Sequence, residues 1–301
     1  MVRWIIRLAD LHRTLLMLVF GVVGPRAAYA YMAPLARLLY RLAAPIRERS
    51  EAQCTAALRG RAPAERIAAI AENSFVHRIW NLADVLLAQR WLRRSALDRV
   101  GGRIPEPLLR ELLTAQERRQ PAILLTAYFG PFDLLPLLLG YNGVRATAVY
   151  RRHANAAFDR LRSRVRAMGG CELITVDEAI ARLPRELDAG GTVAILADHH
   201  AVRRGIDTTF LGLPTRVPRT VGILACRHGA DVIVAGLRRV RRSFRFEFLT
   251  TSVIRHAEWE SADDPVLYVT ERYLHALERL VLSDPEQYLW AYARWGRDVP
   301  R

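Results

Sequence analysis

The chain has 301 residues, 51% of them hydrophobic, which is enough apolar material for one large core or two modest ones. Its formal net charge of +15 predicts an anionic partner, and nucleic acid and anionic lipid are the two obvious classes. The sequence has no helix-turn-helix pattern, zinc framework or RNP-like aromatic pair, so we expect no nucleic-acid partner. Three widely separated cysteines, Cys54, Cys171 and Cys226, indicate neither a disulfide framework nor a metal site.

An apolar run near the amino terminus, Thr14 to Gly24, holds eleven residues without a charge. Extending it by twelve residues admits one charge, Arg26, and two prolines, Pro25 and Pro34. Eleven residues are too few to cross a hydrocarbon core of about 30 Å, whereas the longer run would bury an arginine. We therefore expect residues 1–45 to form a helical, membrane-associated anchor that is short, kinked or lies on the membrane surface.

Two other interpretations of this segment stay open. The basic residues Arg3, Arg7 and Arg13, followed by Ala28-Tyr29-Ala30, resemble a signal peptide that is cleaved. The same apolar residues could also form a helix buried in the core.

Helical spacing of apolar residues predicts three helices before residue 120, over 35–48, Pro63 to Leu92 and Pro107 to Arg118. After residue 121, short apolar strands alternate with helices. The expected strands are Ala122 to Thr126, Ala146 to Tyr150, Glu172 to Val176, Thr192 to Ala197, Asp231 to Leu237 and Phe244 to Phe248. The expected helices are Phe132 to Leu139, Ala154 to Met168, Val176 to Ala189, Thr220 to His228 and Val266 to Leu282. This alternation predicts an α/β domain over residues 46–301, with a helical lead-in over 46–118 and ligands at the carboxyl ends of the strands.

The turn Tyr128-Phe129-Gly130-Pro131-Phe132-Asp133 closes the first predicted strand and opens a helix. Gly130 suits the turn, and Pro131 suits a first helical position. Asp133 then falls in the first helical turn, where exposed N–H groups and the helix dipole favour a carboxylate. Asp133 is therefore either a functional carboxylate or an anion that only stabilises the helix start.

Polar segments also follow other predicted strands: Tyr150 to Asn155, Asp198 to His200, and Arg203 to Pro214. Because strand carboxyl ends meet at one edge of an α/β sheet, we expect these arginines, imidazoles and carboxylates along one rim. His199 and His200 are neighbours that would point to opposite sides of an extended segment, so they do not suit a shared metal ion.

Five motifs, in order, resemble the bacterial lipid A biosynthesis (lauroyl/myristoyl) acyltransferase family over residues 30–297. AILLTAYFGPFDLL resembles the family's strand, His-x-x-x-x-Asp/Glu turn and helix, and VYRRHANAAFDRLRSRVRAMGG resembles its Tyr-Arg-x-x-x-Asn segment. AILADHH resembles the Ala-Asp-Gln strand end, and TTFLGLPTRVP resembles the Phe-x-Gly-x-Pro loop. PEQYLWAYARWGR resembles the closing segment of the family, with Tyr292 where the family often has His. The resemblance implies the glycerol-phosphate-acyltransferase-like fold, a mixed α/β sheet flanked by helices.

The resemblance also implies an activity. A fatty acyl group would move from an acyl thioester, on acyl carrier protein or coenzyme A, to a hydroxyl of an anionic glycolipid such as a lipid A precursor. The reaction would take place at the membrane surface, on the cytoplasmic face of the bacterial inner membrane, with the thioester as co-substrate and no cofactor or metal. In the family mechanism, His removes the hydroxyl proton and an acidic residue five positions on supports the imidazole. Tyr128 and Asp133 occupy those two positions, and the residues expected to bind substrate are Arg151, Asn155, Arg164, Asp198, His199, Arg204, Phe210, Gly212 and Pro214.

Tyr128 stands where the family has its catalytic His, and a phenol with an ordinary pKa of about 10 is a poor base at neutral pH. Three hypotheses follow. The first is a working acyltransferase whose base is His153, His199, His200, or Tyr128 itself with a lowered pKa. The second is a catalytically impaired homologue that binds anionic lipid or acyl carrier protein without turnover. The third is a transferase or hydrolase that uses the same scaffold for different chemistry.

Overall fold

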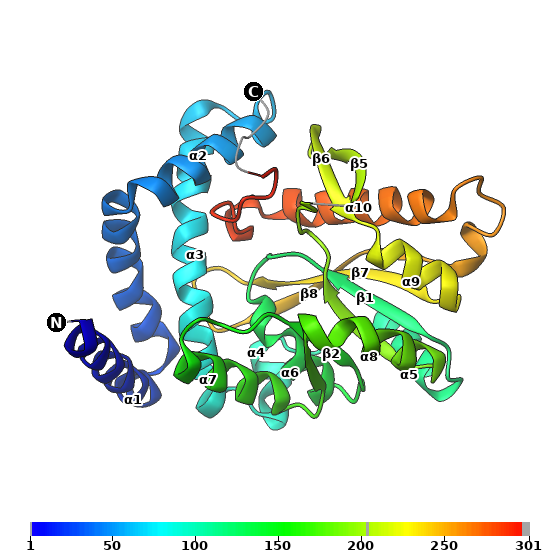
Figure 1. Ribbon diagram of the computed structural model, residues 1–301. Helices are drawn as coiled ribbons and strands as arrows, with labels where there is room; N and C mark the ends of the chain where they lie inside the picture. The colour runs from blue at the N-terminus through cyan, green and yellow to red at the C-terminus, as the bar shows by residue number, and fades with distance from the viewer. Residues whose placement is uncertain (1, 203–204, 297–301) are drawn as a thin grey trace.

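The computed structural model describes the backbone of residues 2–202 and 205–296 and, among these, the side chains of residue 19 and of residue 22 onward. A six-stranded sheet with the order β3-β2-β4-β1-β7-β8 forms the centre (Figure 1). Its strands are β1 (Ala122–Thr126), β2 (Thr147–Tyr150), β3 (Glu172–Thr175), β4 (Thr192–Leu196), β7 (Asp231–Arg239) and β8 (Phe246–Ile254). All neighbouring strands of this sheet pair in parallel except β7 and β8, which are antiparallel. The predicted α/β class with helices flanking a sheet is confirmed.

Strand β1 lies inside the sheet, between β4 and β7, and each of its five residues is buried. Its sequence AILLT has no charged side chain, as expected for a parallel strand that is covered on both faces. The carboxyl end of β1 leads directly into the turn that begins at Tyr128, so the best-buried strand of the sheet positions that turn.

Helices cover the sheet on both sides (Figure 1). They are α4 (Leu97–Val100), α5 (Glu106–Glu117), α6 (Leu135–Tyr141), α7 (Ala156–Ala167), α8 (Val176–Asp188), α9 (Thr220–His228) and α10 (Pro265–Ser283). Helix α8 contacts β2, β3 and β4, and α10 contacts β7 and β8, with α9 between these two helices. Helix α7 instead packs on α6 and α3, which brings α3 next to the carboxyl end of β2.

The first three helices form a group beside the sheet. They are α1 (Val2–Leu42), α2 (Ala44–Leu58) and α3 (Ala64–Trp91). Helix α1 bends at Gly24, whose φ of 80° and ψ of 176° are not helical, and its later part packs along α3 (Figure 1). The helix predicted over 35–48 is instead the end of α1 and the start of α2, because Pro45 opens a new helix. Among the described residues, no helix combines the length and the apolar character needed to cross a membrane. The division into residues 1–45 and 46–301 stays a prediction.

A β-hairpin, β5 (Gly205–Phe210) with β6 (Leu213–Pro218), follows the loop after β4. The sequence predicted a loop over residues 203–214, and the strands β5 and β6 show that this prediction was wrong. Pro214 and Pro218 are tolerated because the hairpin is a separate two-stranded unit in which each strand is an edge.

The chain returns to the amino-terminal helices after α10. Gln53 on α2 donates through Nε2 to the carbonyl oxygens of Trp290, at 2.5 Å, and Tyr292, at 2.7 Å. Its Oε1 accepts a hydrogen bond of 2.9 Å from the backbone N–H of Arg294. Because the Gln53 side chain is 1% exposed, these bonds fix the carboxyl-terminal segment against α2 without competition from water.

The turn after β1 passes very close to β7. Gly130 has a φ of +54°, and a Cβ built on it would lie 1.8 Å from the carbonyl oxygen of Leu237. Glycine is therefore required twice at this position, once for its left-handed backbone and once for its missing side chain.

Replacing Gly130 with alanine tests this close approach. The variant Gly130→Ala must move β7 or the turn and also hold alanine in left-handed backbone, so we expect the free energy of unfolding to fall by about 2 to 5 kcal/mol. Urea denaturation measures the change. The control is Gly143→Ala, since Gly143 also has a positive φ, of 87°, but no atom lies within 4 Å of its added Cβ. Equal losses in both variants would contradict the steric role of Gly130.

Candidate functional site

Tyr128 is held by its backbone at the end of β1. Its N–H donates to Oδ2 of Asp198 at 3.1 Å, and its carbonyl oxygen accepts from the N–H of Leu289 at 2.9 Å. Asp198 follows β4 and is fully buried, so two neighbouring strands and the carboxyl-terminal segment converge on this one residue. These hydrogen bonds fix the backbone of Tyr128 and thereby the direction in which its side chain leaves the turn.

The Tyr128 hydroxyl oxygen lies 3.4 Å from Nε2 of His199. The other ring nitrogen of His199, Nδ1, lies 2.9 Å from the carbonyl oxygen of Leu196. A carbonyl can only accept, so Nδ1 carries the proton in the neutral ring and Nε2 is left as an acceptor for the phenol. Burial, followed by repulsion from Asp198, raises the pKa of Tyr128 to about 12. The phenol is therefore neutral and donates toward an unprotonated imidazole nitrogen.

Aromatic rings surround this pair. The Tyr128 ring contacts Phe132 and Tyr292 with centroid separations of 5.1 Å each, and Tyr292 also contacts His199 at 5.8 Å. These contacts restrict the rotamers of Tyr128 and lower the polarity around its hydroxyl group. Tyr292 stands at the predicted closing motif, so the fold brings that motif to the turn after β1.

Asp133 makes its ion pairs on the other side of the turn. Its carboxylate accepts two hydrogen bonds from Nη2 of Arg162, at 2.7 and 2.9 Å, and another from Nη2 of Arg166. Burial alone would raise the pKa of Asp133, but the guanidinium groups of Arg166 and Arg162 outweigh burial and hold that pKa below its ordinary value. Within the described chain, no hydrogen bond joins Asp133 to Tyr128. The carboxylate thus stays charged as the partner of two arginines from α7.

A basic cleft opens in front of Tyr128 and has a volume of about 280 Å³. Five arginines and one carboxylate, Asp133, contribute to its lining. The arginines are Arg78 on α3, Arg151 and Arg152 after β2, and Arg162 and Arg166 on α7. Since Asp133 can neutralise only one of these charges, the cleft keeps an excess of positive charge that suits an anionic ligand.

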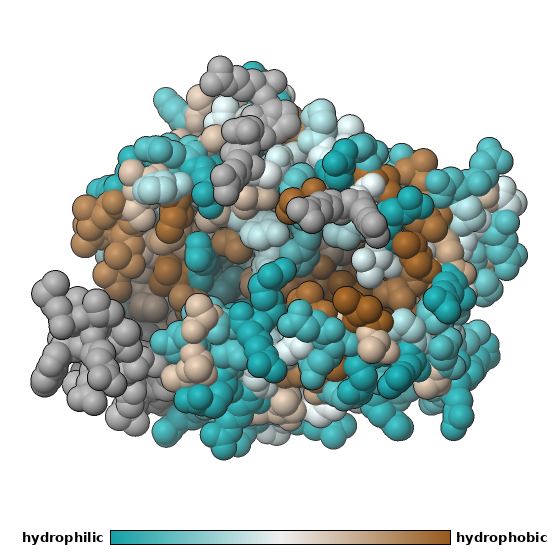
Figure 2. Space-filling model, in the orientation of Figure 1, coloured by the Kyte–Doolittle hydropathy of each residue, from teal (hydrophilic) through white to brown (hydrophobic). Residues whose placement is uncertain are grey.

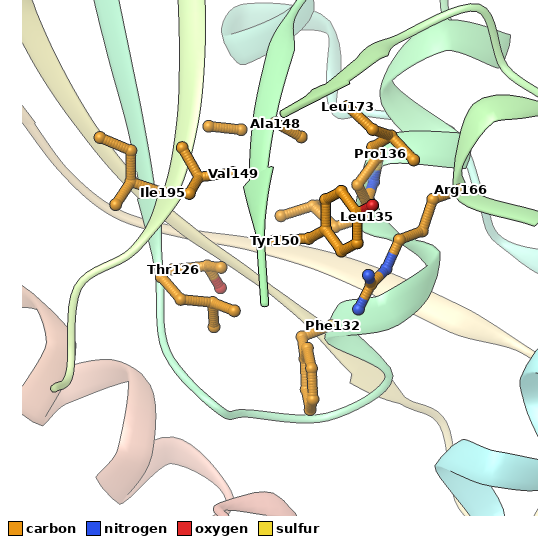
Figure 3. A pocket seen from close by; sticks show the side chains of 12 residues that line it. Thr126, Phe132, Leu135, Pro136, Ala148, Val149, Tyr150, Arg166, Leu173 and Ile195 are labelled. Carbon is orange, nitrogen blue, oxygen red and sulfur yellow. The ribbon is translucent and has the colours of Figure 1, made fainter. Parts of the chain in front are cut away.

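A smaller apolar cavity of about 40 Å³ adjoins the basic cleft, and the two share Phe132, Tyr150, Arg166 and Leu196. Figure 3 shows Tyr150, Phe132 and Arg166 among the side chains that line the apolar cavity. The guanidinium carbon of Arg166 lies 5.5 Å from the centre of the Tyr150 ring, so this arginine stacks at the junction of the two spaces. The positively charged cleft and the apolar cavity therefore adjoin each other at these shared residues.

The remaining predicted residues lie in several places. Asn155 is the N-cap of α7 and accepts a bond of 2.9 Å from the N–H of Phe158. Arg164 is exposed and does not line the cleft, whereas its neighbours Arg162 and Arg166 do. Arg204 lies outside the described residues.

The predicted loop Phe210 to Pro214 forms the turn of the β5–β6 hairpin, away from the basic cleft. Phe210 is fully buried beneath the guanidinium group of Arg294, 4.5 Å from its ring centre, and Gly212 supplies a positive φ of 80°. Pro214 and His200 line a different cavity of about 430 Å³. His200 thus lines this cavity, whereas the His199 ring lies against Tyr128 and Tyr292.

Sequence reasoning missed Arg78, Asn81, Arg162 and Arg166 as cleft residues. The sequence does hold a signal for Arg162 and Arg166. Together with Phe158 they recur every four residues, so all three share one face of α7. No local pattern marks Arg78 or Asn81, since α3 reaches the cleft only through the packing of distant segments. The described residues contain no cluster of three or more His, Cys, Asp or Glu side chains that could hold a metal ion.

The ion pairs of Asp133 predict a defined stability effect. Removing the charge in Asp133→Asn leaves Arg162 and Arg166 without their buried partner, so we expect the free energy of unfolding at pH 7 to fall by about 3 kcal/mol. Because the pKa of Asp133 is lowered in the folded state, its contribution is complete above the ordinary value of 3.8 and is lost as the pH falls further. The difference between variant and wild type should therefore shrink in acid.

Urea denaturation between neutral and acidic pH measures this effect. The matched control is Asp207→Asn, because Asp207 and its partner Arg216 have side chains that are 73% and 45% exposed. An exposed pair contributes about 0 to 1 kcal/mol. A loss in Asp133→Asn as small as that of the control would show that the buried pair does not support the turn.

Comparison with known proteins agrees with this arrangement. A search of curated proteins returned no match. A family profile described as bacterial lipid A biosynthesis acyltransferase matches residues 15–297, nearly the whole chain. The match includes the turn at Tyr128, the basic cleft and the carboxyl-terminal segment that carries Tyr292. The chain therefore belongs to the bacterial lipid A biosynthesis acyltransferase family.

Proposed function

We propose that this protein transfers a fatty acyl group from an acyl thioester, on acyl carrier protein or coenzyme A, to a hydroxyl of an anionic glycolipid such as a lipid A precursor. The observation that carries the proposal is the pairing of Tyr128 with an acceptor nitrogen of His199 at the wall of a basic cleft. Family membership supports acyl transfer in general. The identities of donor and acceptor belong to the proposal.

His199 serves as the base, and Tyr128 relays the proton. Tyr128 lines the cleft, so an acceptor hydroxyl can donate to the phenol oxygen while the phenol donates to Nε2 of His199. As the proton shifts, the acceptor oxygen attacks the thioester carbonyl carbon, the carbon–sulfur bond breaks, and the imidazolium returns the proton to the leaving thiolate. Tyr128 never becomes a free phenolate, which is consistent with its raised pKa of about 12.

The basic cleft suits the phosphate groups of an anionic lipid, and the adjoining apolar cavity suits an acyl chain. Arg151, Arg152 and Arg162 line the cleft and can bind phosphate groups through their planar, forked donors. The apolar cavity beside Tyr150 and Arg166 can accept part of an acyl chain. Asp133 acts here by fixing the arginines rather than by touching the proton relay.

The proposal places the protein at the cytoplasmic face of the bacterial inner membrane, and the outer surface of α1 supports a position at a membrane surface. Several large apolar side chains there are exposed, and Figure 2 shows brown surface on that side of the molecule. They are Val19, Val22, Val23, Tyr31, Leu38, Leu39 and Leu42, from 41% to 76% exposed. In this proposal, α1 lies on the membrane as a kinked segment through its exposed apolar side chains, and the positive charge of the protein adds attraction to anionic lipid.

The first test is acyl transfer by detergent-solubilised protein, using labelled acyl carrier protein or acyl coenzyme A with an anionic glycolipid extract. Tyr128→Phe and His199→Gln should each lower kcat by about 10² to 10⁴, because each removes one member of the relay. His200→Gln is the control and should keep the wild-type kcat, since His200 lines the separate cavity.

Two results would contradict this mechanism. Full activity in His199→Gln would remove His199 from the relay. Absence of wild-type turnover, with lipid binding retained and activity gained in Tyr128→His, would instead identify a catalytically impaired homologue that binds its ligands.

The membrane proposal has its own test. In Val22→Glu/Leu42→Glu, two exposed apolar side chains of α1 become charged, so binding to phosphatidylcholine–phosphatidylglycerol vesicles should fall by at least about tenfold. Co-sedimentation with vesicles measures the binding. Ile180→Glu on α8 is the control, because Ile180 is 85% exposed but lies on another helix. An equal loss in the control would contradict a specific role of α1.

A further inference from the structure

The turn that carries Tyr128 is held from α3 by one side chain. Asn81 donates through Nδ2 to the carbonyl oxygen of Gly130 at 2.7 Å, and Asn81 is 9% exposed. On the other side, the N–H of Gly130 donates to the carbonyl oxygen of Gln287 at 2.9 Å. Gly130 lies between Tyr128 and Asp133 in the sequence, so these two bonds fix the backbone from which both side chains project.

Arg239, at the end of β7, determines how the Asn81 amide is oriented. Its Nη2 lies 2.8 Å from Oδ1 of Asn81, and a guanidinium group can only donate. Oδ1 must therefore face Arg239, which turns the Asn81 NH₂ group toward Gly130. The backbone N–H and carbonyl of Arg239 also bond the side chain of Gln287, at 2.8 and 2.9 Å. Arg239 thus reaches both sides of Gly130.

The same arginine connects the turn to α1. Asp84 on α3 accepts hydrogen bonds from both Nη2 of Arg239 and the hydroxyl of Tyr29. The Tyr29 ring contacts Trp80 at 5.3 Å and lies 5.4 Å from the guanidinium carbon of Arg239. Tyr29, Asp84 and Arg239 are each no more than 2% exposed. Nη1 of Arg239 also lies 2.9 Å from Nδ1 of His77.

We propose that Asn81 is a positioning residue for Tyr128 and that Tyr29 on α1 controls it through Asp84 and Arg239. The buried ion pair of Asp84 and Arg239 joins α3 to β7, and such a pair often adds no net stability over apolar residues of similar volume. The polar contacts that begin at Tyr29 instead end on the carbonyl oxygen of Gly130. There they fix the orientation of the turn that carries Tyr128. Helix α1, which carries Tyr29 and the exposed apolar side chains, is therefore coupled to the geometry of Tyr128 and His199.

The inference deepens the proposed function, and its test has one readout that needs no turnover. The variant Tyr29→Phe removes only a hydroxyl group from a site remote from the cleft lining. We expect kcat to fall by about tenfold to a hundredfold, because a displaced turn misplaces Tyr128. We also expect a change in the NMR chemical shift of His199 Nε2, assigned with His199→Gln, because that nitrogen accepts from Tyr128.

Tyr40→Phe is the matched control. Tyr40 is also a buried tyrosine of α1, 4% exposed, and its hydroxyl lies 3.4 Å from Oε1 of Glu51 on α2, outside the Arg239 contacts. The control should leave both kcat and the His199 shift unchanged. A second variant, Asn81→Asp, removes the donor to Gly130 within nearly the same volume and should shift the His199 resonance in the same way.

The proposal is overturned if Tyr29→Phe and Asn81→Asp leave the His199 resonance where it is in wild type, whatever their stability. It is also overturned if Tyr40→Phe shifts the resonance as much as Tyr29→Phe. Absence of acyl transfer in wild type, together with the expected resonance changes, would count against the proposed function and would still support the positioning role.

Discussion

The whole site depends on the passage of the turn after β1 across the backbone of β7, at a distance that only glycine permits. Gly130 occupies left-handed backbone with Leu237 directly against it, so the turn cannot shift without displacing a buried strand. Tyr128 and Asp133 leave this fixed turn in different directions. One meets His199 beyond β4, and the other meets two arginines of α7. A steric constraint on one residue thus separates the contact of Tyr128 with His199 from the ion pairs of Asp133.

This separation bears on the roles proposed for Tyr128 and Asp133. A neighbouring imidazole and carboxylate form a dyad in which the carboxylate stabilises the imidazolium, whereas a phenol that stays neutral carries no positive charge for a carboxylate to stabilise. Here Asp133 is bound by Arg162 and Arg166, and the imidazole comes from a different strand end, through His199. In the proposed mechanism the two tasks of the dyad are divided, with charge balance on one side of the turn and proton transfer on the other. Fixed dipoles and charges of this kind need little rearrangement during the reaction.

Much of the fold could be predicted because local sequence determines it. The apolar run Ala122 to Thr126 matches β1 residue for residue, and Thr220 to His228 matches α9. The β5–β6 hairpin was missed because its prolines are compatible with strands only at edges, and edges depend on the tertiary arrangement. Strand β8 was predicted too short because its second half, with Thr250, Thr251 and Ser252, lacks apolar alternation.

The site was less predictable than the fold, for a related reason. Strand carboxyl ends can be located from the sequence, so Tyr128, Arg151 and His199 were natural candidates. Which side chains meet there depends on how α3 and α7 cross the sheet edge, and that packing involves contacts between distant residues. Asn81 shows this most clearly, since its only sign in the sequence is a polar residue in an otherwise ordinary helix.

The bonds from Gln53 to the carboxyl-terminal segment have a consequence for biosynthesis. Gln53 is paired with residues as far as 241 positions along the chain, and the same segment supplies Leu289 and Tyr292 to the surroundings of Tyr128. During translation, α1, α3 and the sheet can form well before these residues leave the ribosome. The Tyr128 side chain is enclosed only when the last turn of the fold docks. The surroundings of Tyr128 are therefore completed only at the end of folding, after the first helices and the sheet are in place.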